Sequence, residues 1–217
     1  MNTNKTIKVS MIHTEVYKHL RYLITSGKIL PGDKITLREI AEKFGVSTMP
    51  VREAVRRLQA EGFLTFDRRS VTVRELSLKE VDQIFIIRQR LETLAAEWAL
   101  PNVTQKDIKI LRELAKKMDD KNILYDEWEE LNREFHLYFY NLSMSESLNQ
   151  LIKNVWDSVT PYMNIFSSSV SSFVSSQEQH HLMIKLIEHK KIEELTILLT
   201  KHLDETRDTI VDVLKNS

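Results

Sequence analysis

Hydrophobic positions in the first third of the chain recur at the spacing of short amphipathic helices. Apolar side chains three and four residues apart predict a helix over about 12–24. A second apolar face follows Thr36-x-x-Glu39, the spacing of a capping box, and ends at Gly45. Ser47 can cap a third helix, whose apolar stripe ends shortly before residue 62. The pattern therefore predicts three helices joined by tight turns.

From residue 63 onwards the spacing and type of the apolar residues become those of β-strands. Residues 63–73 are rich in β-branched and aromatic side chains on both sides of a polar centre, which predicts a β-hairpin. Three helices followed by a hairpin describe a winged helix-turn-helix.

Beyond residue 75 the pattern is helical throughout, and this part contains no glycine. Ser77-x-x-Glu80 is another capping box, and its helix is expected to point seven apolar side chains inward: Val81, Ile84, Phe85, Ile87, Leu91, Leu94 and Ala95. Further helices are predicted over about 104–121, 126–142, 147–159, 177–188 and 192–214. The serine-rich stretch 167–176 fits a loop or a helix end, so an all-α bundle of six or seven helices is expected.

Charge divides the chain at the same place. The net charge of zero conceals an excess of six positive charges in residues 1–75 and of six negative charges in residues 76–217. A basic module joined to an acidic one suggests that the first part meets a polyanion. We therefore expect a mainly α protein with two domains, 1–75 and 76–217.

Composition narrows the remaining classes. The chain has no cysteine, so disulfides and thiolate metal sites are excluded, and this fits a cytoplasmic protein. Its N-terminus has no apolar signal segment, and no apolar run approaches the ~20 residues of a membrane span.

The third predicted helix carries side chains suited to DNA. Its N-terminal residues would reach base edges in the major groove, while the hairpin tip would offer cations to a neighbouring groove or phosphate. The candidate DNA-binding residues are Arg38, Ser47, Thr48, Met49, Arg52 and Arg56, with Arg68 and Arg69 at the tip.

This part resembles the GntR family of bacterial regulators. The resemblance rests on a proline-glycine turn in LPGDK and on the strings LREIAEKFGVS and PVREAVRRLQAEG, at 30–34, 37–47 and 50–62. It implies that Arg38 and Arg52 contact DNA. Two departures stand out: Thr48 follows the capping serine where the family usually has arginine, and Met49 replaces a frequent threonine. The lost arginine removes a bidentate contact with guanine, so base preference is expected to be unusual. The wing also lacks the usual glycine at its tip, a departure that bears on its role in the minor groove.

Four polar residues of the second domain are candidate metal ligands. Asn132 and His136 are four apart and share a helix face, while His180 and His202 lie on later helices. Three imidazoles and an oxygen ligand would suit Zn²⁺ or Ni²⁺ inside a helical bundle. On spacing alone, the favoured interpretation is scattered histidines that are exposed or satisfied by one hydrogen bond each.

The same domain resembles the FCD effector domain of the FadR-like GntR subfamily. The resemblance rests on IRQRLE, NREFH, HHLMI and HL, at 87–92, 132–136, 180–184 and 202–203. It implies a divalent metal held by an aspartate and three histidines, which helps to bind a small carboxylate effector. Here Asn132 occupies the aspartate position, and an amide oxygen is the weaker ligand. The 22-residue spacing to His202 favours His180 over the adjacent His181.

Several other side chains have two interpretations. Arg88 is a candidate clamp for an effector carboxylate, or forms an ion pair with Glu92 one turn later. The three tryptophans are expected in the core, and three histidines at or near the surface: His13, His19 and His189.

The sequence therefore predicts a homodimeric repressor that binds double-stranded operator DNA and responds to a small organic acid beside a divalent metal. The alternatives are a regulator for which the ion itself is the signal, or a metal-dependent hydrolase. No nucleophile or general-base motif supports an enzyme.

Overall fold

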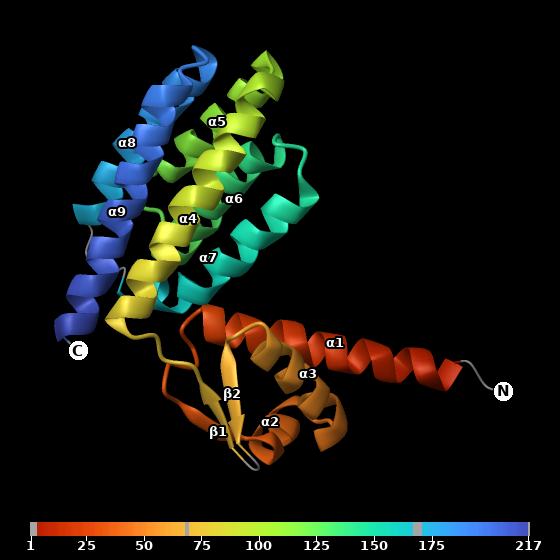
Figure 1. Ribbon diagram of the computed structural model, residues 1–217. Coiled ribbons are helices and arrows are strands. Elements are labelled where there is room, and N and C mark those ends of the chain that lie inside the picture. The colour runs from red at the N-terminus through yellow and green to blue at the C-terminus, as the bar shows by residue number, and fades with distance from the viewer. Residues whose placement is uncertain (1–3, 68–69, 167–170, 217) are drawn as a thin grey trace. The chain divides into compact units, whose positions relative to one another are not determined.

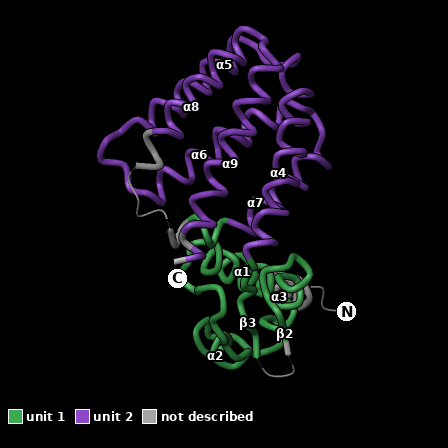
Figure 2. The backbone as a smooth tube through the Cα atoms, turned by 60° about the vertical axis from the view of Figure 1, so that its left-hand side comes forward, with its two compact units in different colours: residues 1–77, 160–164 green, residues 78–159, 165–217 purple. Residues whose placement is uncertain are grey.

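A computed structural model describes residues 4–67, 70–166 and 171–216 (Figure 1). The chain divides into two compact units, residues 1–77 with 160–164, and residues 78–159 with 165–217 (Figure 2). The prediction of a mainly α protein with an N-terminal winged helix-turn-helix and a helical C-terminal part is confirmed. The expected hairpin-tip residues Arg68 and Arg69 lie outside the described residues.

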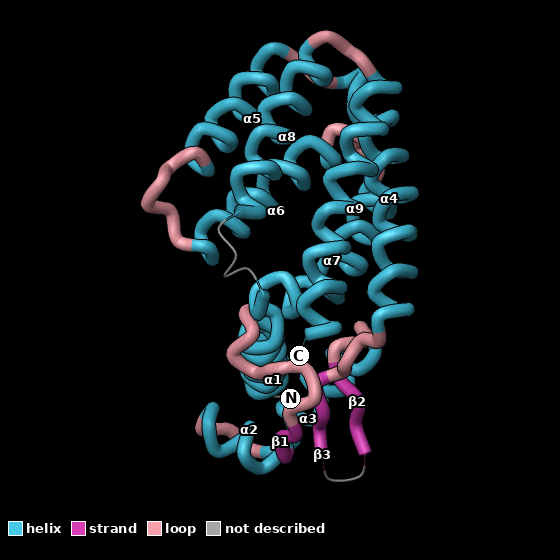
Figure 3. Tube along the Cα trace, turned by 90° about the vertical axis from the view of Figure 1, so that its left-hand side faces the viewer, coloured by secondary structure: helices cyan, strands magenta, loops and turns pink. Residues whose placement is uncertain are grey.

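The described part of the first unit has three helices and a small sheet. The helices are α1 (Asn4–Thr25), α2 (Leu37–Phe44) and α3 (Thr48–Ala60), and the strands are β1 (Lys34–Thr36), β2 (Leu64–Asp67) and β3 (Ser70–Val73). All pairings are antiparallel in the order β1-β3-β2, with Val71 opposite both Ile35 and Phe66 (Figure 3). The hairpin was predicted, but β1 was not. A three-residue strand has no readable alternation, and only its pairing with β3 defines it.

The helix caps predicted for α2 and α3 form as expected, with one exception. Thr36 and Glu39 form the expected reciprocal capping box, and Gly45 ends α2 in a left-handed conformation with φ 63°. Ser47 holds the N-cap position of α3, but its side chain accepts no capping hydrogen bond. The apolar stripe of α3 packs into the core of the unit, and the opposite side of the helix stays in solvent.

The second unit is a helical bundle. It contains α4 (Leu78–Ala99), a 3₁₀ turn (Leu100–Asn102), α5 (Gln105–Met118), α6 (Tyr125–Asn141), α7 (Glu146–Phe166), α8 (Ser171–Glu188) and α9 (Ile192–Asn216). The described part of 78–217 thus has six α-helices. α7 continues past its expected end at 159 and includes Pro161, and α8 begins at 171 rather than 177. Residues 167–170 of the serine-rich stretch lie outside the described residues.

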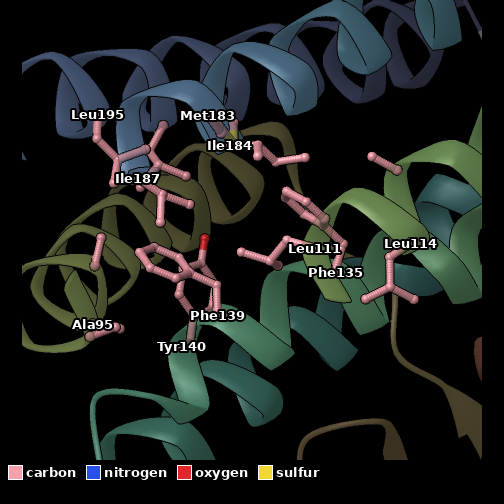
Figure 4. Close-up of a cluster of buried hydrophobic side chains, with 14 of the residues drawn as sticks. Ala95, Leu111, Leu114, Phe135, Phe139, Tyr140, Met183, Ile184, Ile187 and Leu195 are labelled. Carbon is pink, nitrogen blue, oxygen red and sulfur yellow. The ribbon is translucent and has the colours of Figure 1, made fainter. Parts of the chain in front are cut away.

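The bundle core is built mainly from α5, α6, α8 and α9. Leu111, Phe135, Ile187 and Leu195 are among its fully buried side chains, and Figure 4 shows them converging from these four helices. The burial of these apolar groups is the main favourable contribution to the stability of the bundle. It also holds facing positions of the helices close enough for their polar side chains to meet.

Two expectations for α4 and for the tryptophans were wrong. Ile87 is 47% exposed and Trp98 is 48% exposed, although both were expected to be buried. The helix turns its Val81–Phe85–Ala95 side to the core, so a residue at the edge of a broad apolar stripe stays in solvent. Trp128 and Trp156 are buried as expected.

Candidate functional site

The third helix of the first unit presents polar groups to solvent. Arg52 and Arg56 are exposed, and Thr48 and Met49 lie uncovered at the N-terminus of α3, with Met49 71% exposed. The expected DNA-binding residues of α3 are therefore free of the core. Ser47 does not cap the first turn of α3 with its side chain, so the backbone N–H groups of Thr48 and Met49 are donors suited to phosphate oxygens.

The arginines of this surface differ in their partners. Arg38 on α2 donates from Nε to Glu42 Oε1 at 2.7 Å, and Arg56 pairs with Glu53 at 3.2 Å. Arg57 turns towards α1, where its guanidinium lies 3.9 Å from the centre of the Tyr17 ring. Within the described residues Arg52 forms no ion pair. Of these cations, Arg52 can therefore reach a DNA group without breaking an intramolecular pair.

Three histidines of the second unit meet inside the bundle. His136 comes from α6, His180 from α8 and His202 from α9, and all are buried. Their ring centres are pairwise 5.1 Å apart, and one ring nitrogen from each lies within 4.8 Å of the others. The sequence singled out these three, and the structure brings them together. His181 is exposed and pairs with Asp119 instead.

Hydrogen bonds fix which nitrogen of His136 carries the proton. Tyr140 donates its hydroxyl to Glu92 Oε2 at 2.8 Å, so its oxygen is left to accept from His136 Nδ1 at 3.3 Å. The proton of His136 therefore lies on Nδ1, and Nε2 carries a lone pair.

The other two histidines are arranged in the same way by glutamines. Gln177 donates to Ala115 O and Asp119 Oδ1, which leaves its Oε1 to accept from His180 Nδ1 at 3.1 Å. Gln179 donates to Glu205 and accepts from His202 Nδ1 at 2.6 Å. Each imidazole thus presents a bare Nε2, which is the arrangement that neighbouring hydrogen bonds impose on metal-binding histidines.

The closest nitrogens of the cluster fit a metal ion. His136 Nε2 and His180 Nε2 are 3.1 Å apart. Two nitrogens bound to one tetrahedral zinc at 2.0–2.1 Å would lie about 3.3 Å apart. With both protons on Nδ1, the facing lone pairs repel each other unless a cation lies between them. The donor set therefore fits a divalent metal.

Asn132 lies one turn before His136 and is also buried. Its Nδ2 donates to Glu129 Oε2 at 3.2 Å, while its Oδ1 is buried with no hydrogen-bond partner among the described residues. An unmatched buried oxygen is costly in a protein interior. Asn132 is thus a buried oxygen donor one helical turn before His136, at the position that the family resemblance assigns to the fourth ligand.

Arg88 forms the ion pair with Glu92 that was one of its two interpretations, and it also keeps a guanidinium nitrogen that could bind a carboxylate. Its Nε donates to Glu92 Oε1 at 2.8 Å in a fully buried ion pair, and its guanidinium lies 4.4 Å from the centre of the Trp156 ring. Its Nη1 is buried and has no partner among the described residues. Glu92 also accepts from Tyr140, so hydrogen bonds connect Arg88 to His136.

Sequence reasoning missed the groups that orient the histidines. Tyr140 lies four residues after His136 and Gln177 three before His180, so helical spacing offered a signal for both. Gln179 and Glu92 act on histidines of other helices, and no local pattern identifies such partners.

Burial shifts the acidity of the cluster. It is the largest reason why the pKa values of His136, His180 and His202 lie below their ordinary range, and that of His202 falls to about 4. The three imidazoles are therefore neutral at neutral pH, which is the form that binds a metal. Burial also raises the pKa of Glu129 to about 7, although Asn132, Arg133 and Arg88 act in the opposite direction.

Without metal, the free energy of unfolding is expected to fall as the pH drops from about 6.5 towards 4. The unfolded chain takes up protons on these histidines near pH 6.5, whereas the folded protein keeps them neutral, so acid favours unfolding. For His202 alone the loss approaches about 3 kcal/mol at low pH. Urea unfolding in the presence of a chelator, repeated across this range, measures the slope. His202→Gln should flatten it and the exposed-site variant His189→Gln should not; equal slopes would contradict the assignment.

None of the described helices is both long enough and apolar enough to cross a membrane.

Two family models match the chain. Residues 12–73 match the model described as bacterial regulatory proteins of the gntR family, and residues 83–205 match the FCD domain. An uncharacterised HTH-type transcriptional regulator of Bacillus subtilis, YdhC, is 32% identical over 161 residues, 72% of either chain. The gluconate operon transcriptional repressor of B. subtilis is 26% identical over 206 residues, 89% of this chain and 83% of the relative.

A third relative also has a solved structure. The HTH-type transcriptional regulator McbR of Escherichia coli is 28% identical over 196 residues, 88% of either chain. Its solved structure superposes with a TM-score of 0.83 at 24% identity and covers 94% of this chain and 98% of McbR's own chain, a likeness of fold.

Proposed function

The chain belongs to the GntR family of bacterial transcriptional regulators and carries an FCD domain, and from this premise we propose that it is a metal-dependent, effector-responsive repressor. Its affinity for operator DNA is controlled by a small organic acid that binds beside a divalent ion in the helical domain. The observation that carries the proposal is the buried cluster of His136, His180 and His202.

The residues proposed to hold the metal are these three histidines and Asn132. Zn²⁺ or Ni²⁺ suits imidazole nitrogens, and the ion would offer a further coordination position to a carboxylate oxygen. The bare Nε2 atoms and the unpartnered Asn132 Oδ1 support this set.

Arg88 is the proposed clamp for the effector's carboxylate. Its ion pair with Glu92 fixes the guanidinium, and Nη1 remains available as a charged donor in a buried setting. Buried unpaired donors of this kind favour a ligand that brings an acceptor of negative charge. The chain of hydrogen bonds through Glu92 and Tyr140 would couple the clamp to a metal ligand.

The DNA-binding surface is proposed to be the exposed side of α2 and α3. Arg52, Thr48 and Met49 would face bases at the N-terminal end of α3, while Ser47, Arg38 and Arg56 would contact phosphates. The wing residues Arg68 and Arg69 are proposed to reach a neighbouring groove.

We further propose a homodimer in which α4 meets a second copy. Its apolar positions at 84, 87, 91, 94 and 98 alternate three and four apart, the spacing of a seam between two packed helices. The half-exposed Ile87 and Trp98 lie on that stripe. Light scattering should give twice the chain mass, and a monomer at working concentration would contradict the dimer.

The test of the function is fluorescence anisotropy with DNA from the protein's own promoter region. Metal-free and zinc-loaded protein are each titrated at two salt concentrations, with and without a panel of small carboxylic acids. The proposal requires binding well above that to random DNA, and a steep loss with salt. A change in affinity that needs both metal and acid supports effector control. A change with zinc alone would indicate that the ion is the signal, and identical affinities in all states would contradict ligand control.

A further inference from the structure

Glu129 is the carboxyl group that is hydrogen-bonded to Asn132 among the described residues. It lies three residues earlier on α6, is 5% exposed, and accepts from Asn132 Nδ2 through Oε2. The proposed function places Asn132 among the metal ligands, at the position where the family's pattern has a carboxylate. The hydrogen bond from Asn132 to Glu129 therefore determines which end of the amide is available to a metal ion.

An amide side chain has two chemically different ends. Its oxygen can bind a metal, whereas its NH₂ group is a donor and repels a cation. A carboxyl oxygen such as Glu129 Oε2 accepts and so pairs with the NH₂ end. This hydrogen bond holds Nδ2 towards Glu129 and leaves Oδ1 as the buried, unpartnered atom. The orientation follows from the chemistry of the two groups.

When ionised, Glu129 also supplies negative charge near the site, and a neighbouring divalent ion favours that ionised form. Three neutral histidines and a neutral amide leave the charge of a divalent ion uncompensated by its own ligands, whereas an aspartate would remove one unit. A carboxylate that is hydrogen-bonded to the fourth ligand compensates part of the ion's positive charge without binding the ion itself. Groups that orient and polarise metal ligands in this way typically contribute 10–100-fold to affinity.

We propose that Glu129 is the positioning residue that makes Asn132 a metal ligand in this chain. It fixes the amide with its oxygen towards the ion and supplies the negative charge that the asparagine lacks. The inference rests on the proposed metal site, and it assigns Glu129 no direct bond to the metal.

The prediction is a reversal of sign in a double-mutant cycle. Glu129→Gln in the natural background should weaken zinc binding by about 10-fold or more, because glutamine holds the amide less strictly and carries no charge. In an Asn132→Asp background, Glu129 would lie against a second carboxyl group. There Glu129→Gln should strengthen zinc binding, because it removes a like charge and adds a donor to the aspartate. Competition with a zinc indicator measures all four affinities.

Glu130→Gln is the matched control. It removes the same charge from the same helix at an exposed position, and it should leave zinc affinity unchanged in both backgrounds. If E129Q alone fails to fold, the comparison of N132D with N132D/E129Q still decides, since only the double variant is expected to bind more tightly.

The outcomes separate the two proposals. Zinc binding by the wild-type protein, with E129Q equal to E130Q, would overturn the role of Glu129 alone. The same loss from E129Q in both backgrounds would assign it a general structural role and overturn the inference. Absence of zinc binding by the wild-type protein would overturn the metal site and this inference with it.

Discussion

Replacing His180 with alanine is expected to abolish high-affinity metal binding while its neighbour His181→Ala leaves it intact. His180 is fully buried, faces His136 at 3.1 Å and has its proton held on Nδ1 by Gln177. His181 is exposed and pairs with Asp119. The two variants remove the same side chain at adjacent positions of α8. A difference between their zinc affinities is therefore due to the place of His180 in the cluster and not to the loss of an imidazole as such.

The expected loss is more than ~100-fold in zinc affinity, beyond the 10–100-fold that changes around a metal ligand usually cost. At a zinc concentration 100 times the dissociation constant, the wild-type protein gains about 2.7 kcal/mol of stability. For a chain of this size that raises the unfolding midpoint by about 5–10 °C. H180A should show no such rise.

The measurement is calorimetric or dye-based unfolding with and without zinc, paired with metal analysis after reloading. Unfolding of the metal-free variants is the reference, because removing a buried imidazole changes stability by itself. A zinc-dependent rise in H180A equal to that of wild type would place the metal elsewhere. Loss of the rise in H181A as well would show that the choice of His180 over His181 is wrong.

Sequence patterns predicted the parts of this fold that depend on neighbouring residues. The capping box at Thr36 and the left-handed Gly45 are local devices, and both form where they were expected. The strand β1 depends on pairing with β3, some 35 residues later, so its own three residues carried no signal. Ile87 was misplaced because a helical period defines an apolar stripe but not which part of it meets the core.

The same distinction between local and distant signals applies to the candidate site. The three histidines could be chosen by type and by resemblance to a family pattern, and the bundle brings them together. The groups that orient them could not, because Gln179 and Glu92 act across helices through distances that only packing sets. Lys190 is another residue whose contacts are distant in the sequence and could not be predicted from a local pattern. In a domain without glycine it adopts a left-handed φ of 54°, and its Nζ donates to backbone carbonyls of Leu100 and Val103.

The second large effect is expected at the DNA-binding helix, where Arg52→Ala should lower operator affinity by about 10–100-fold. Arg52 is exposed near the N-terminus of α3 and, within the described residues, has no ion-pair partner. A free guanidinium at this position is suited to a bidentate contact with guanine, which is worth about 1–3 kcal/mol. Because Thr48 stands where the family usually has a second arginine, fewer side chains share the readout, and the dependence on Arg52 rises.

Arg57→Ala is the matched control on the same helix. It removes the same charge, but Arg57 lies over Tyr17 and pairs with Glu61 on the side that faces α1. Anisotropy titrations with operator and random DNA should show that R52A loses preference for the operator. R57A should lower both affinities by a smaller, salt-dependent factor, as a change in long-range charge does. An R52A variant that weakens operator and random DNA equally would assign Arg52 to phosphate binding, and the reading of bases would then have to come from Thr48 and Met49.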